Sequence, residues 1–154
     1  MPPCISAQQL SHSLPIMQLQ RPIQFRQINL AKSKVATANF GSCMVKWSDN
    51  SLFALIQEPA TTKRGRIESL PRGTQTFSAG LHPRAAVLAT PELNVWAMPE
   101  HTSRDVASCL WKTDSTDFPE IIIISVYSDI NKDTISPELL CHLFGTAGPT
   151  RSRT

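Results

Sequence analysis

Hydrophobic and polar positions in the first third of the chain predict a strand, a helix and a second strand. The stretch "IQFRQINL", residues 23–30, follows a proline and suits a short strand. Beyond it, apolar residues recur with helical spacing, at positions 31, 35, 40, 43, 44 and 47. The continuous apolar run "LFALIQ", residues 52–57, is typical of a strand covered on both faces. Because the connections are short, residues 23–57 predict a βαβ-like unit.

The helix in this unit contains a glycine, Gly41. A glycine in a helix interior weakens the helix by about 1 kcal/mol relative to alanine. We therefore expect Gly41 to cost stability, and we expect the polar stretch "SDNS", residues 48–51, to end the helix.

After residue 57 the pattern changes to a series of short strands. The candidates are "TQTFSAG", "RAAVLAT", "NVWAMP", "DVASCLWKT" and "EIIIISVYS", each bounded by Pro, Gly, Asn or Asp and with no helical pattern between them. We expect residues 120–126 to be buried on both faces, like residues 52–57. The stretch "SPELLCHLF", which starts at Ser136, has the cap, proline and glutamate of a helix start. Together these elements predict an α/β (α+β) domain with a mixed sheet.

The two ends of the chain differ in composition from this core. Residues 1–22 are rich in Gln, Ser and Pro and predict a disordered leader, and residues 145–154 predict a loose C-terminal tail. Residues 23–144 between them are long enough for one domain. The longest apolar run is far below the ~20 residues that cross a bilayer, so we expect a soluble protein with no membrane partner. The four cysteines lack zinc-binding spacing, which favours reduced thiols in an intracellular protein.

The formal net charge is +3, and its densest basic stretch is "TTKRGRIESLPRG", residues 61–73. It contains Lys63, Arg64 and Arg66. A basic loop attracts phosphate backbones. On charge alone, an ordinary solvated loop explains the same residues equally well.

Three predicted strands end on polar side chains that suit phosphate chemistry. Glu58 follows the run 52–57, and ligands of open α/β sheets bind at the carboxyl ends of strands. Its carboxylate is a hard ligand that suits Mg²⁺; alternatively, Glu58 leaves the core at a turn. Asn29, near the end of the first strand, could support a metal-bound water or cap the helix. Tyr127, the only tyrosine, could donate a hydrogen bond to a phosphate oxygen. Alternatively, its ring lies at the rim of the sheet with its hydroxyl in water.

Arg104 and Asp105 are adjacent in "TSRDV". An arginine beside a carboxylate can form part of a phosphate clamp, or an ordinary surface ion pair. The sequence contains no Ser-His-Asp arrangement, P-loop or glycine-rich nucleotide fingerprint.

Four stretches carry a resemblance to a known family: "QINLAKSKVATANF", "FALIQEP", "PRAAVLATPELNVWAMPEHTSRDVASCLWK" and "IIIISVYSD". In this order they resemble the N-terminal part of the endonuclease domain of non-LTR retrotransposons, especially arthropod elements that insert into fixed target repeats. That domain belongs to the exonuclease–endonuclease–phosphatase superfamily, with pancreatic DNase and the apurinic/apyrimidinic endonucleases. The resemblance runs from about Phe25 to about Phe144 and rests on the combination of "INL", "IQEP" and "SRDV".

The resemblance implies a four-layered α/β sandwich that hydrolyses a DNA phosphodiester with Mg²⁺, in the nucleus. It implies that Glu58 is the metal ligand, that Asn29 is the active-site asparagine beside it, and that Tyr127 contacts the scissile phosphate. Arg104 and Asp105 match a Ser-Arg-Asp stretch whose role the resemblance leaves open.

The chain departs from the family pattern after Tyr127, where an aromatic residue and a proline are replaced by Ser128 and Asp129. The family's Gly-Asp-x-Asn segment and its later Asp and His have no counterpart after Phe144. We therefore expect about the first half of the domain, with little activity alone, and whether the chain is an enzyme stays open. The alternatives are a non-catalytic DNA-binding module, using Arg84 and Arg104 with the basic loop, and a decayed reading frame without function.

Overall fold

The computed structural model describes residues 22–47 and 50–129. The predicted leader (residues 1–22) except its last residue, the predicted helix from Ser136 and the predicted tail all lie outside the described residues. The described elements are β1 (Ile23–Asn29), α1 (Lys34–Lys46), β2 (Ser51–Gln57), β3 (Gln75–Phe77), β4 (Ala85–Ala89), β5 (Val95–Ala97), the short 3₁₀ helix η1 (Pro99–His101), β6 (Val106–Lys112) and β7 (Glu120–Val126). All the strands predicted from the sequence are therefore present.

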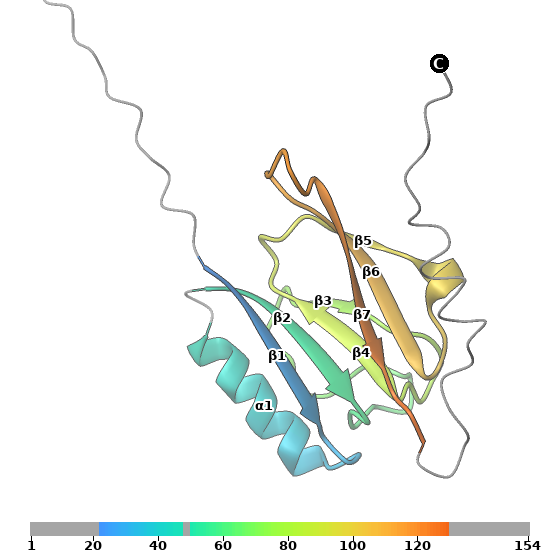
Figure 1. Ribbon diagram of the computed structural model, residues 1–154. Coiled ribbons are helices and arrows are strands. Elements are labelled where there is room, and N and C mark those ends of the chain that lie inside the picture. Colours follow the sequence, from blue (N-terminus) through green and yellow to red (C-terminus); the bar gives the residue numbers. More distant parts are fainter. Residues whose placement is uncertain (1–21, 48–49, 130–154) are drawn as a thin grey trace, which may run out of the picture.

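The strands form two sheets that pack face to face (Figure 1). The first sheet has the order β1-β2-β4-β3, and the second has the order β5-β6-β7. β1 and β2 pair in parallel, whereas β2 and β3 each pair with β4 in the antiparallel direction. Helix α1 lies on the side of the first sheet that faces away from the second sheet. The predicted βαβ unit and the mixed sheet are confirmed, as is the α/β sandwich, of which the described residues form three layers.

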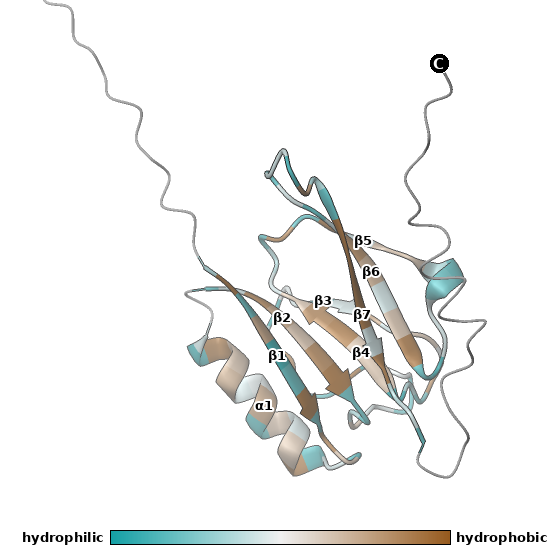
Figure 2. Ribbon diagram, viewed as in Figure 1, coloured by the Kyte–Doolittle hydropathy of each residue, from teal (hydrophilic) through white to brown (hydrophobic). Residues whose placement is uncertain are grey.

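Strand β2 supplies both hydrophobic cores of this sandwich. Leu52, Ala54 and Ile56 belong to the core between the first sheet and α1. Phe53 alternates with them and belongs to the core between the two sheets, where its ring lies 5.4 Å from that of Trp111. Successive side chains of a strand point to opposite faces, so a strand covered on both sides is apolar throughout. Figure 2 shows this as an unbroken hydrophobic band along β2.

Helix α1 begins later than the apolar spacing predicts. Ala31 and Lys32 have φ angles of 49° and 56°, in the left-handed region, so the chain turns sharply before the helix. Ser33 is the N-cap, and its side-chain oxygen accepts a hydrogen bond from the Ala36 N–H at 3.1 Å. Val35, one of the positions that predicted the apolar face, is 70% exposed because the true helical register places it toward solvent.

The prediction that residues 120–126 are buried on both faces is wrong. Among residues 22–47 and 50–129, β7 pairs with β6 and ends the second sheet. Ile123 and Ser125 point inward and are buried, whereas Ile122 on the other face is 36% exposed. A continuous apolar run does not distinguish a central strand from an edge strand, because it carries no information about which strands become neighbours.

Gly41 is required by the packing of α1, contrary to the expectation that it only weakens the helix. A Cβ atom at this position would lie 2.0 Å from the backbone oxygen of Ser69. The segment after β2 therefore passes so close to the helix that only hydrogen fits between them.

We predict that Gly41→Ala destabilises the protein by about 1–3 kcal/mol, because the overlap with Ser69 outweighs the better helix propensity of alanine. The free energy of unfolding in urea measures the change. Ser42→Ala on the exposed side of the same helix is the matched control and should be neutral or slightly stabilising. A Gly41→Ala protein as stable as the parent would show that the Ser69 segment moves away at no cost.

Candidate active site at the carboxyl edge of the sheets

Strands β1, β2 and β7 end along the same edge of the sandwich, at the bottom of Figure 1. The parallel register pairs Asn29 with Gln57, which brings Asn29 beside Glu58, the next residue in the chain. Tyr127 follows β7 in the other sheet, and its phenol lies near enough to the Glu58 carboxylate for the negative charge of Glu58 to act on it. The structure therefore brings together the three strand-end residues that the sequence singled out.

Glu58 leaves β2 in a strained backbone conformation. Its φ is 47°, which is uncommon for a residue with a side chain and differs from the extended form preferred before a proline such as Pro59. Two hydrogen bonds hold this conformation: the Glu58 N–H donates to the Arg84 carbonyl at 2.8 Å, and the Glu58 carbonyl accepts from the Lys32 N–H at 2.7 Å. Strain of this kind costs roughly 1–3 kcal/mol and concentrates at functional sites.

The Glu58 side chain is 19% exposed, and the Lys32 ammonium lies 3.8 Å from its carboxylate. Lys32, which the sequence did not point to, reaches Glu58 because the left-handed turn before α1 folds it toward the end of β2.

Asn29 supports the loop between β1 and α1. Its side-chain oxygen accepts a hydrogen bond from the Ala31 N–H at 2.8 Å, across the left-handed turn. The alternative that Asn29 caps the helix is wrong, because Ser33 occupies that position. The exposed Asn29 side chain therefore lies at the candidate site while it also stabilises the turn that carries Lys32.

The backbone and the phenol of Tyr127 both interact with residues of neighbouring segments. Its backbone N–H donates to the Asp105 carbonyl at 2.8 Å. Burial raises the pKa of its phenol, and so do the negative charges of Glu58 and Asp129, whereas Arg84 lowers this pKa. The phenol is therefore a neutral hydrogen-bond donor over the whole physiological pH range.

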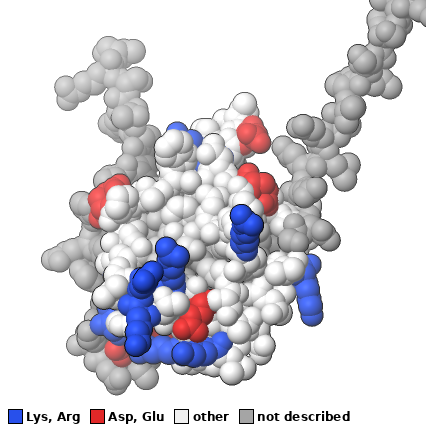
Figure 3. All heavy atoms as spheres, turned by 180° about the vertical axis from the view of Figure 1, so that it is seen from behind, with Lys and Arg blue, Asp and Glu red and all other residues white. Residues whose placement is uncertain are grey.

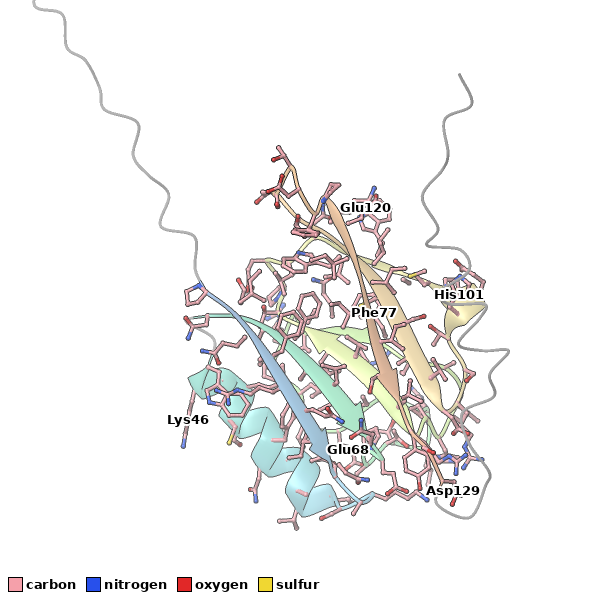
Figure 4. The ribbon with its side chains drawn as sticks, viewed as in Figure 1. Lys46, Glu68, Phe77, His101, Glu120 and Asp129 are labelled. Carbon is pink, nitrogen blue, oxygen red and sulfur yellow. The ribbon has the colours of Figure 1, made fainter. Side chains whose placement is uncertain are left out.

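Arg84, which the sequence suggested only as a DNA contact of a binding module, also lies at this edge. Its guanidinium binds both carboxylate oxygens of Asp105 and lies 3.3 Å from the carboxylate of Asp129. The hydrogen bond to Asp105 holds the pKa of Arg84 above its ordinary value. Figure 4 shows Asp129 just beyond the end of β7, at the same edge. The sequence suggested that Asp105 pairs with its neighbour Arg104, whereas in the structure Asp105 pairs with Arg84.

The predicted basic loop is a compact exposed turn after β2. Thr61 and Ile67 form an isolated β-bridge, and Lys63, Arg64 and Arg66 between them are exposed. Arg104 is also exposed, and its Nε donates to the His82 carbonyl at 3.3 Å. From the opposite side of the molecule, Figure 3 shows lysine and arginine side chains gathered in its lower part, toward the edge where the strands end.

Within residues 22–47 and 50–129, no cluster of three or more His, Cys, Asp or Glu side chains is arranged to hold a metal ion. The same part of the chain contains no helix long and apolar enough to span a membrane. Glu58 offers a carboxylate beside Asn29 and near Tyr127, and a single carboxylate fits an ion whose remaining ligands are water.

Titration of Tyr127 tests the geometry of this edge. We predict that Glu58→Gln lowers the pKa of Tyr127, because it removes the negative charge that opposes ionisation of the phenol. Since this is the only tyrosine, the ultraviolet absorbance of phenolate against pH reports on it directly. Glu100→Gln, on an exposed carboxylate of η1, is the control and should leave the pKa unchanged.

The raised pKa also predicts how stability depends on pH. In the unfolded chain the phenol ionises near its ordinary pKa of about 10, before it does so in the folded protein. The contribution of the Tyr127 phenol to stability is therefore complete below pH ~10 and is lost as the pH rises through the folded pKa.

In the titration of Glu58→Gln, an unchanged pKa of Tyr127 would show that the side chains of Glu58 and Tyr127 do not interact.

Comparison with known proteins identifies the fold. No protein-family model and no curated protein sequence matches the chain. Among solved structures, the endonuclease domain of TRAS1, a telomere-specific non-LTR retrotransposon, is similar to this chain with a TM-score of 0.61 and 23% sequence identity. The alignment covers 81% of this chain and 53% of that domain, so the chain spans about half of the structure that it matches. The chain thus has the fold of a non-LTR retrotransposon endonuclease domain, as the resemblance in its sequence predicted.

Proposed function

We propose that this chain provides the metal-binding and phosphate-contacting part of an Mg²⁺-dependent DNA endonuclease site. The observation that carries the proposal is the convergence of Glu58, Asn29 and Tyr127 on one edge of an endonuclease-type sandwich. DNA is the proposed partner, and hydrolysis of a phosphodiester is the proposed chemistry.

Glu58 is the residue that would hold the metal ion. Mg²⁺ commonly binds through one or two carboxylates and keeps several waters, so a single partly exposed carboxylate suits it. When bound, such an ion supplies a Lewis acid for a phosphoryl oxygen and a more acidic water. Lys32, now 3.8 Å from the carboxylate, offers positive charge for a phosphate once Glu58 binds the ion.

Tyr127 and the basic turn would bind the DNA. The neutral phenol of Tyr127 can donate to a phosphate oxygen, where developing charge strengthens the hydrogen bond. The exposed Lys63, Arg64 and Arg66 suit the sugar–phosphate backbone on either side of the scissile bond.

Proton transfer is the part of the reaction that the described residues support least. The carboxylates of Asp105 and Asp129 lie at this edge, but both bind Arg84 and so are not free to accept a proton from an attacking water. Removal of one member of a catalytic unit commonly costs several orders of magnitude in rate. The chain alone therefore should bind DNA and metal while it cleaves slowly.

We predict that the purified chain nicks supercoiled plasmid in Mg²⁺ at least ~10³-fold more slowly than a complete endonuclease domain of the same fold. Whatever nicking occurs should disappear in Glu58→Gln, because the carboxylate is the metal ligand. Conversion of supercoiled to open-circular plasmid measures the rate. Nicking that persists unchanged in Glu58→Gln would contradict the role of Glu58 and point to a contaminating nuclease.

We also predict that DNA binding depends on the basic turn. Lys63→Gln should weaken binding at low salt and reduce the slope of log K against log salt by about 1, since one phosphate contact is lost. Gel shifts at several salt concentrations measure both effects. Lys46→Gln, an exposed lysine on the far end of α1 (Figure 4), is the matched control and should leave the slope unchanged. Equal effects of the two changes would indicate non-specific attraction to net charge.

A further inference from the structure

The side chain of Arg84 connects the two sheets at the candidate site. Arg84 directly precedes β4 in the first sheet, and Asp105 directly precedes β6 in the second. The Arg84 Nε donates to one Asp105 oxygen at 2.5 Å, and a terminal nitrogen binds the other oxygen. The Arg84 side chain is 12% exposed and the Asp105 side chain 37%, so the contact is shielded mainly on the arginine side. Two-point arginine–carboxylate contacts fix geometry as well as charge.

The same guanidinium contacts the Tyr127 ring directly and two aspartates that lie next to Tyr127 in the chain or in space. Its central carbon lies 4.6 Å from the centre of the Tyr127 ring, within the range of a cation–π contact. It also binds Asp129, two residues after the tyrosine, at 3.3 Å. Asp105, which it binds on the other side, accepts the Tyr127 backbone N–H at 2.8 Å. The ring, the following loop and the backbone of Tyr127 therefore all depend on the position of Arg84.

The backbone of Arg84 determines the path of Glu58. Its carbonyl accepts the Glu58 N–H at 2.8 Å, which supports the left-handed conformation of Glu58. Its own N–H donates to the Arg104 carbonyl at 2.7 Å, in the loop just before Asp105. Arg84 thus contacts the Glu58 backbone and the Tyr127 ring at once.

We propose that Arg84 is the positioning residue of this site, holding the Tyr127 ring beside the Glu58 carboxylate across the two sheets. What the positioned pair does in a reaction rests on the proposed function, whereas the positioning itself does not. Arg84 does not serve as a DNA contact, because two carboxylates already neutralise it and little of it reaches solvent. Lysine cannot replace it, since an ammonium lacks the planar fork that binds Asp105 at two points and lies over the ring.

Nuclear magnetic resonance of the full chain with isotope-labelled tyrosine tests this, because Tyr127 gives the only ring signals. We expect Arg84→Gln and Arg84→Lys to move these signals toward those of free tyrosine, with no rescue by lysine. Arg26→Gln is the matched control, since Arg26 also lies over an aromatic ring, 5.1 Å from the centre of Trp47. It should leave the Tyr127 signals in place. Thermal unfolding of each variant shows separately that it folds.

Two further variants keep the test decisive if Arg84 variants fold poorly. Asp129→Asn and Asp105→Asn each remove one anchor of the guanidinium and should move the Tyr127 signals in the same direction. Signals that stay at the parent position in folded Arg84→Gln, or in both aspartate variants, would overturn the proposal. So would an equal shift in Arg26→Gln.

Added Mn²⁺ separates this inference from the proposed function. A paramagnetic ion at Glu58 should broaden the Tyr127 signals in the parent, and Glu58→Gln should abolish the effect. In Arg84→Lys, we expect less broadening at equal occupancy, because the ring no longer lies beside the carboxylate. No broadening in the parent would argue against the metal site, while the shifts caused by Arg84 variants would still establish its positioning role.

Discussion

The burial of β2 on both faces is the constraint on which the rest of the structure depends. One face of this strand completes a core with α1, and the other face completes a core with the second sheet. Burying each large apolar side chain of this strand contributes about 1.5–3 kcal/mol, so a shift of the strand by one residue would exchange the two faces and disrupt both cores. The register of β2 is therefore fixed, and with it the place where the chain leaves the sheet, at Glu58.

Because the position at which β2 ends is fixed, the edge that carries Glu58, Asn29 and Tyr127 can be built from loops that have little hydrophobic support of their own. Glu58 accepts a left-handed backbone, Asn29 holds a turn, and Tyr127 reaches across from the other sheet. Arg84 connects the sheets at this edge, through its two carboxylate partners and through the hydrogen bond from its N–H to the Arg104 carbonyl. A site that spans two sheets needs such a link, since neither sheet alone determines the distance between Glu58 and Tyr127.

The elements of the fold were predictable from the sequence because their signals are local. Alternation and apolar runs are read within a few residues, and the strands were found where these signals lie. The errors occurred where distant residues decide the outcome. Gly41 could not be understood without Ser69, nor the exposed face of β7 without its place at the sheet edge. Lys32 and Arg84 were missed as neighbours of the site for the same reason.

The sequence by itself determined the strands, the helix and the residues that end them, because backbone propensity and the order of apolar positions are properties of short segments. It also carried the motifs through which the endonuclease fold was identified. Only the tertiary structure decided which strand ends meet, which arginine binds Asp105, and which face of β7 is covered. These contacts join segments up to tens of residues apart, and their partners are chosen by the packing of whole layers, which no local pattern records.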